Sequence, residues 1–312
     1  MSFTKHNIYK PASKKQILHT IMHWRSLLFV PAHEERFINS CINKGASAIA
    51  LDLEDSVPKN KKQHARQNYP LYVALLRSAN CEVCVRINSD LRACVADLEV
   101  VVITGTAAIV VPKVIGIDQL ILIDELILKL EQERNLPENG IALIAMVESA
   151  QALQKSSQWG EGCSRLAALF FGTEDFCLDT GMQASPENLF YPAQQLVLAA
   201  KSIGVLAFGF PASIADYSNL SMLRASISSG KSMGFDGVFC IHPKQVDIVN
   251  EVYQPISAEI DQAGLIVKAY ELGQSQGKGA VEVAGKMIDA PVYHRAKKLL
   301  SEAFIHGSRK GS

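Results

Sequence analysis

The sequence predicts an α/β fold, a (β/α)8 (TIM) barrel that carries a C-terminal arm made of a helix, a hairpin and a second helix. Three observations support this prediction. Eight apolar, strand-like runs follow one another along the chain, and uncharged runs of this kind are typical of strands buried on both faces of a parallel sheet. Their starts lie about thirty residues apart, the length of one βα unit. The segments between them have helical periodicity, and several end on glycine just before the next strand.

Eight alternating units favour a closed barrel. A doubly wound open sheet is the alternative, but such a sheet usually has a glycine-rich phosphate turn after its first strand, where this chain has PAHEER. The predicted strands occupy residues 26–32, 47–55, 81–88, 107–114, 141–149, 166–176, 205–213 and 237–243.

The strand–helix rhythm ends near residue 255, so the barrel is expected over residues 25–255 and the arm over 256–312. A long amphipathic helix should open the arm. Alternating residues around Ala284-Gly285 then predict a small hairpin, and Pro291 stands in the first turn of the final helix. Residues 1–24 are expected to form a loosely packed leader.

The composition is that of an ordinary globular enzyme, with 48% apolar and 20% charged residues among 312. Thirty-one basic and 31 acidic residues balance, which argues against binding to nucleic acid or to an anionic membrane. No stretch is long and apolar enough to span a bilayer. The N-terminus lacks the apolar region of a secretory signal, although composition leaves a short mitochondrial presequence open. The seven cysteines, an odd number, indicate reduced thiols and a cytoplasmic protein.

Two apolar runs in the middle of the chain end on carboxylates, Glu148 and Asp175. In parallel α/β folds the functional site lies at the carboxyl ends of the strands. Two carboxylates on successive strands there predict a Mg²⁺ site that leaves other coordination positions to water and substrate. Such a metal polarises ligands with adjacent oxygens, for example a 2-oxo or 2-hydroxy acid.

Other polar residues stand at predicted strand ends, and each also has a structural interpretation. Arg86 would stabilise an oxyanion formed as a bond breaks, or it would be a buried ion-pair partner. Glu54 and Asp55 could instead cap the helix that follows them. Four further residues at strand ends are weaker candidates: Asn88, Lys113, Glu174 and His242. A metal next to an arginine suits carbon–carbon cleavage or formation beside a carbonyl.

Several motifs, in order along the chain, resemble the citrate lyase β-subunit-like (CitE-like) family of the HpcH/HpaI aldolase superfamily. They include RSLLFVPAHEERF, ALDLEDSVP, VRIN, FFGTEDF, CIHPKQ and GKMIDAP, and the resemblance covers about residues 25 to 302. It implies a TIM barrel with a C-terminal arm, usually a homotrimer, that cleaves malyl-, citramalyl- or citryl-thioesters with Mg²⁺.

The resemblance also implies roles for individual residues. Glu148 and Asp175 match the metal ligands of the family, and Glu148 also contacts substrate. Arg86 matches the substrate-binding arginine, and Arg25 a coenzyme A contact. Glu54 and Asp55 match the acidic pair that supports the metal and its waters.

Asp289, in GKMIDAP, matches the aspartate that the arm delivers to the site of a neighbouring subunit. Without the resemblance, an aspartate before Ala-Pro is a good helix N-cap.

From the resemblance as a whole, the expected function is cleavage of (S)-citramalyl-CoA, an acyl-CoA thioester, to acetyl-CoA and pyruvate. Malyl-CoA lyase and citryl-thioester lyase are alternatives, and a non-catalytic barrel subunit of a larger complex is a third.

Overall fold

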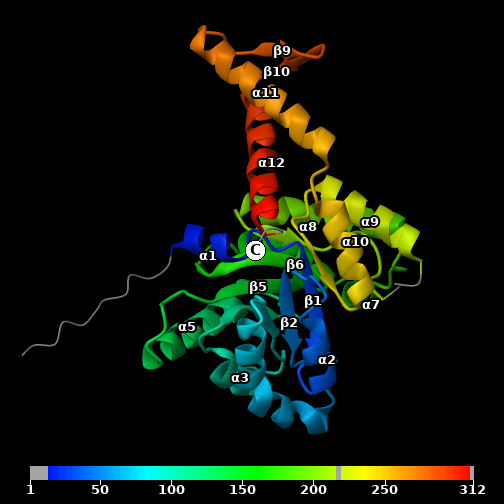
Figure 1. The fold of residues 1–312 in the computed structure, drawn as a ribbon. Coiled ribbons are helices and arrows are strands. Elements are labelled where there is room, and N and C mark those ends of the chain that lie inside the picture. The colour runs from blue at the N-terminus through cyan, green and yellow to red at the C-terminus, as the bar shows by residue number, and fades with distance from the viewer. Residues whose placement is uncertain (1–12, 216–218, 310–312) are drawn as a thin grey trace, which may run out of the picture. The chain divides into compact units, whose positions relative to one another are not determined.

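The computed structural model describes residues 13–215 and 219–309 and contains an eight-stranded parallel barrel (Figure 1). Its strands, in sheet order, are β7 (Leu206–Phe208), β6 (Leu166–Phe171), β5 (Ala142–Val147), β4 (Thr106–Val111), β3 (Val83–Arg86), β2 (Ala48–Asp52), β1 (Ser26–Pro31) and β8 (Val238–Cys240). A parallel bridge between Phe208 and Gly237 joins β7 to the segment before β8. The predicted (β/α)8 architecture is confirmed.

Helices follow the strands around the barrel. They are α2 (Glu35–Cys41), α3 (Lys62–Ser78), α4 (Leu91–Val101), α5 (Ile117–Glu133), α6 (Ala150–Lys155), α7 (Thr173–Thr180), α8 (Pro186–Ser202), α9 (Leu220–Met233) and α10 (Pro243–Tyr253), with short 3-10 turns at Lys59–Lys61 and Ser156–Gln158. In the strands β2, β5 and β6 every residue is buried. Apart from Asp52 at the end of β2, these strands carry no charged residue, because one face packs inside the barrel and the other against the helices.

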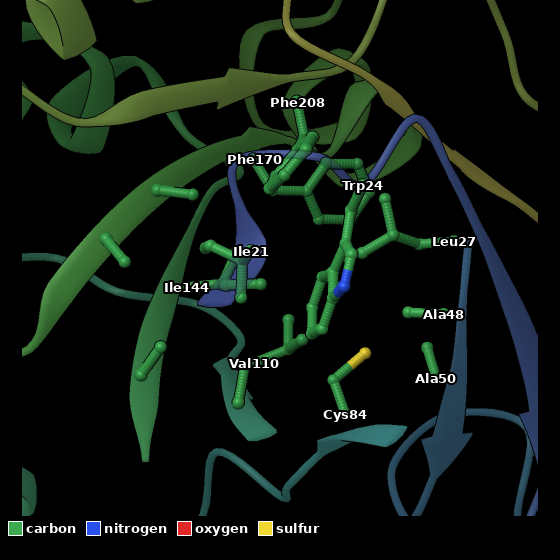
Figure 2. Close-up of a cluster of buried hydrophobic side chains, with 14 of the residues drawn as sticks. Ile21, Trp24, Leu27, Ala48, Ala50, Cys84, Val110, Ile144, Phe170 and Phe208 are labelled. Atoms are coloured by element: carbon green, nitrogen blue, oxygen red, sulfur yellow. The ribbon is translucent and has the colours of Figure 1, made fainter. Parts of the chain in front are cut away.

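The segment before β1 differs from the expected loose leader. Helix α1 (Lys14–Ile21) begins with a capping box at Ser13 and Gln16, and the side chains of Ile17, Ile21 and Trp24 join the core inside the barrel. Figure 2 shows Trp24 among Leu27, Val110 and Phe208, which belong to β1, β4 and β7. The prediction of loose packing was wrong for residues 14–24, because three apolar side chains at helical spacing fill the barrel interior.

The chain divides into two compact units at Asn250 and Glu251. In the second unit, α11 (Ser257–Ser275) is followed by the antiparallel hairpin of β9 (Val281–Val283) and β10 (Lys286–Ile288), and then by α12 (Ala290–Arg309). Tyr270, Ile288 and Tyr293 form its small core. The hairpin turns at Ala284 and Gly285, both with positive φ, as the turn chemistry predicts.

Within the described residues, no helix has the length and the apolar character that crossing a lipid bilayer requires.

Candidate active site

A cavity of about 320 Å³ lies at the carboxyl ends of the barrel strands. Three stacked aromatic rings line it: Phe239 lies 4.9 Å from Phe29 and 4.2 Å from Phe170, measured between ring centroids. Met146 adds to this apolar surface. The polar residues of the lining include Asp52, Asp55, Ser56, Arg86, Glu148, Glu174 and Asp175. The cavity thus combines an apolar wall with a group of carboxylates and one arginine.

Arg86 is fixed by a two-pronged ion pair with Asp52. The parallel register of β2 and β3 sets the two residues opposite each other. Arg86 Nε donates to Asp52 Oδ1 at 2.8 Å, and Nη2 donates to Oδ2 at 2.7 Å. Burial alone would raise the pKa of Asp52, but the hydrogen bonds and the charge of Arg86 outweigh burial and lower it. The pair therefore stays ionised, and the guanidinium has one orientation.

Two further contacts hold the Arg86 guanidinium at the cavity. Its carbon Cζ lies 4.8 Å from the centroid of the Phe29 ring, at a distance typical of cation–π contacts. Its Nη1 lies 3.2 Å from Glu54 Oε2. The structure therefore brings Arg86 and Glu54 together as the sequence predicted, and it adds Asp52, which the sequence analysis did not select. The signal was present, because Asp52 ends the apolar run of β2.

Lys113 follows β4 in a left-handed conformation, with φ of 52°. Its backbone N–H donates to Glu148 Oε2 at 2.6 Å. Its ammonium donates to Glu54 Oε1 at 2.8 Å and to Asp55 Oδ1 at 3.5 Å. One lysine thus contacts carboxylates that follow β2 and β5, although the sequence offered it only as a weak candidate.

Glu148 comes directly after β5 and is buried. Asp175 does not end a strand as expected: it lies in the first turn of α7. Both side chains still line the cavity. Gly172 makes room for Glu148, because a Cβ at that position would lie 2.5 Å from Glu148 Cγ. The glycine of FFGTEDF therefore has a steric role beside the site.

Burial raises the pKa of Glu148 to about 8. The hydrogen bond from the Lys113 amide lowers this pKa, whereas the negative charges of Asp175 and Glu54 raise it further. Two carboxylates that repel each other in this way form a site for a cation.

Three weaker candidates make structural contacts. Glu174 accepts a hydrogen bond from Ser213 Oγ at 2.6 Å. The Asn88 side chain donates to the Leu53 carbonyl and to Asp97. His242 Nδ1 accepts from the Lys244 amide at 3.1 Å, within the start of α10.

Arg25 makes structural contacts at the other end of the barrel. It precedes β1 and so lies at the amino end of that strand, opposite to the carboxyl end that forms the cavity. Its guanidinium is buried and donates to the carbonyl oxygens of Met22 and Asp236 at 3.0 Å. These contacts give Arg25 a structural role in fastening the end of the barrel, and the coenzyme A contact stays a prediction.

Asp289 belongs to the second unit, between β10 and α12. Its Oδ1 accepts a hydrogen bond from the Val292 backbone N–H at 3.2 Å, as an N-cap does. The cap is the structural interpretation that the sequence offered, and it leaves the other carboxylate oxygen for a second partner.

Comparison with known families gives a clear match. The HpcH/HpaI aldolase/citrate lyase family covers residues 25–243. The chain belongs to this family. The resemblance seen in its motifs is confirmed, and so is the enzyme class, a carbon–carbon lyase.

Its relatives include enzymes that differ in their named substrates. The chain is 32% identical to citrate lyase subunit beta of Escherichia coli strain K12, over 92% of this chain and 95% of that protein. It is 31% identical to (3S)-malyl-CoA thioesterase of Cereibacter sphaeroides, over 90% and 94%. It is 29% identical to mitochondrial citramalyl-CoA lyase of Mus musculus, over 95% and 91%.

A solved structure is similar as well. The protein CitE from Mycobacterium tuberculosis, in complex with magnesium, acetoacetate and coenzyme A, is 25% identical with a TM-score of 0.67. The match covers 90% of this chain and 98% of that one.

The raised pKa of Glu148 predicts how the stability of EDTA-treated protein depends on pH. The folded chain holds this proton up to about pH 8, whereas the ordinary pKa is 4.5. Between these values the folded state binds more protons than the unfolded state, so the free energy of unfolding should fall as pH rises. Urea unfolding at a series of pH values measures it, and Glu148→Gln should remove this part of the slope. An unchanged slope in Glu148→Gln would show that Glu148 does not titrate in this range.

Proposed function

We propose that this chain is a Mg²⁺-dependent lyase that cleaves (S)-citramalyl-CoA to acetyl-CoA and pyruvate. One observation carries the proposal: a paired carboxylate site, Glu148 and Asp175, shares an apolar cavity with an arginine of fixed orientation. Membership of the HpcH/HpaI aldolase/citrate lyase family supports the same reaction class.

The residues at the cavity fit Mg²⁺. Glu148 and Asp175 offer only oxygen ligands, which this hard cation prefers. Glu54 Oε2 is buried and lies 3.2 Å from Arg86 Nη1, but it accepts no hydrogen bond within the described structure, so it suits an acceptor for a metal-bound water. Within the described ranges, no group of three or more His, Cys, Asp or Glu side chains is poised for a metal, so the proposed site has two protein ligands. The similar CitE structure contains magnesium. When bound, Mg²⁺ would act as a Lewis acid toward a 2-hydroxy or 2-oxo acid.

The protein residues then have distinct roles. Arg86 lines the cavity with its guanidinium held in one plane, so it can stabilise negative charge on a substrate oxygen without reorienting. The hydroxyl proton of citramalyl-CoA would pass to the Asp55 carboxylate, which lines the cavity, as the carbon–carbon bond breaks to give pyruvate and the enolate of acetyl-CoA. Asp289 would protonate the enolate carbon as a general acid. Asp55 and Glu54 would support the metal and its waters.

The lining favours a small apolar substituent on the carbon that is cleaved. Phe29, Met146 and Phe170 offer apolar surface to the methyl group of a citramalyl substrate. A citryl substrate would carry an extra carboxylate, and Arg86, already paired with Asp52, is the one cationic residue among the described residues of the lining. A buried charge without a partner is costly, which disfavours citryl-thioesters. Malyl-CoA is the closer alternative, because it lacks only the methyl group.

A second subunit would complete each site. We propose a homo-oligomer, a trimer by resemblance to the family, in which Asp289 serves the barrel of a neighbour. Asp289 lies between the paired strands of the hairpin and the start of α12, and the hydrogen bond from the Val292 amide fixes its side chain. A non-catalytic barrel subunit would need neither the paired carboxylates nor the arginine of fixed orientation.

Removal of the metal ligands tests the function. Glu148→Gln and Asp175→Asn should each lower turnover of citramalyl-CoA by about 10³-fold or more, because each removes a charged ligand of the metal. Release of acetyl-CoA, the product common to citramalyl-, malyl- and citryl-CoA, measures this for all three substrates, with Asp118→Asn on α5 as the matched control. Full activity in excess EDTA, or in both site variants, would overturn the metal mechanism. Faster cleavage of citryl-CoA would overturn the substrate assignment alone.

Mixing two inactive variants tests the role of Asp289. Asp289→Asn and Arg86→Ala should each be nearly inactive, whereas mixed oligomers should regain activity because some sites combine an intact barrel with an intact arm. Subunit exchange is followed with a tagged chain and native mass spectrometry. A verified mixed oligomer that stays as inactive as its parents would contradict a shared site.

A further inference from the structure

Lys113 has a place in the candidate site that the reaction described above does not use. Its ammonium nitrogen lies 2.8 Å from Glu54 Oε1 and 3.5 Å from Asp55 Oδ1. Its backbone amide holds Glu148, a proposed metal ligand, at 2.6 Å. The residue therefore contacts both a metal ligand and the acidic pair that would support the metal.

Lys113 makes these contacts from a left-handed backbone conformation. A lysine with φ of 52° is in the left-handed region, which is unfavourable for residues with a Cβ. Strained residues of this kind persist only where the surroundings hold them, often at functional sites. Here both ends of the residue are held, the amide by Glu148 and the ammonium by Glu54.

The other nearby cations, Arg86 and Lys62, donate their hydrogen bonds to groups other than the Glu54 carboxylate. Arg86 forms its two-pronged pair with Asp52. The Lys62 ammonium donates to the backbone carbonyl oxygens of Leu53 and Glu54 and to the Asn88 side chain, which are not carboxylates. Among the described ion pairs, Lys113 and Arg86 are the cations that contact the Glu54 carboxylate, and only Lys113 donates a hydrogen bond to it.

We propose that Lys113 is a positioning residue that keeps Glu54 and Asp55 out of the coordination sphere of the metal. Its ammonium holds an oxygen of Glu54; without that contact, the Glu54 side chain would be free to turn toward the metal as a third carboxylate ligand. The metal is thereby restricted to Glu148 and Asp175, and its remaining positions stay open for a chelating 2-oxo or 2-hydroxy acid. This inference rests on the proposed Mg²⁺ site.

The proposal predicts opposite effects on two ligands when the ammonium is removed. Glu54 would become free to coordinate and one repelling charge would be lost, so Mg²⁺ should bind more tightly. The chelating acid should bind less well, because its positions are partly taken. A lysine that only stabilises the loop would weaken both ligands when it is replaced.

The test is isothermal titration calorimetry of the full-length protein, first with Mg²⁺ and then with pyruvate in saturating Mg²⁺. In Lys113→Met the dissociation constant for Mg²⁺ should fall by about fivefold, in keeping with the loss of one nearby positive charge at a partly exposed site. Pyruvate should bind about tenfold more weakly, as expected when a third protein oxygen fills an octahedral position. Lys113→Arg, which keeps the charge, should restore tight pyruvate binding.

Two controls keep the result interpretable. Lys113→Gly keeps the amide and suits the left-handed backbone, so it should behave like Lys113→Met if the ammonium is responsible. Lys129→Met removes one charge from the exposed face of α5 and should change neither ligand. Unchanged or weaker Mg²⁺ binding in both Lys113→Met and Lys113→Gly would overturn the inference, and so would unchanged pyruvate binding in these two variants. A parent protein that binds no Mg²⁺ would instead overturn the proposed metal site itself.

Discussion

The ion pair between Arg86 and Asp52 is the constraint on which the candidate site depends. The parallel register of two neighbouring strands brings their last residues together, and the pair is held by two short hydrogen bonds. Buried ion pairs of this kind contribute little net stability, because desolvation offsets their attraction. Their value here is orientation: Arg86 is held against the Phe29 ring and faces the cavity in one plane.

The same pair sets the balance of charge at the carboxyl ends of the strands. Asp52 is neutralised by Arg86, and Glu54 by Lys113. Among the carboxylates of the lining, Glu148, Glu174 and Asp175 then have no ammonium or guanidinium contact in the described ion pairs, and Glu174 accepts a hydrogen bond from Ser213 instead. Burial already raises the pKa of Glu148. A divalent cation would relieve this repulsion. The arrangement therefore explains why two carboxylates, rather than the whole acidic group, are suited to a metal.

Much of this could be predicted from the sequence. The barrel follows from apolar runs that repeat at the length of a βα unit, because both faces of each strand are buried. Glu148 and Arg86 could be selected because the ends of parallel strands meet at one side of a barrel. The position of Asp175 on α7 was not predicted, since the end of a strand and the first turn of a helix look alike in FFGTED.

Other features depend on contacts between residues far apart in the chain. The pairing of Asp52 with Arg86 requires the strand register, and the positive φ of Lys113 has no signature in VPKV. Gly172 matters because of a side chain that follows the preceding strand. The packing of α1 did have a signal, since Ile17, Ile21 and Trp24 repeat at helical spacing.

The most direct test of the central claim is a double-mutant cycle on kcat/KM for citramalyl-CoA with Arg86→Lys and Asp52→Asn. If Asp52 acts by orienting the guanidinium, each change should lower kcat/KM by about 10²–10³-fold, as loss of an oriented donor does. The double variant should then be little worse than the poorer single one, because the two residues act as a unit. Near-parental activity in Asp52→Asn, with the protein folded, would contradict the account, and so would losses that multiply in the double variant.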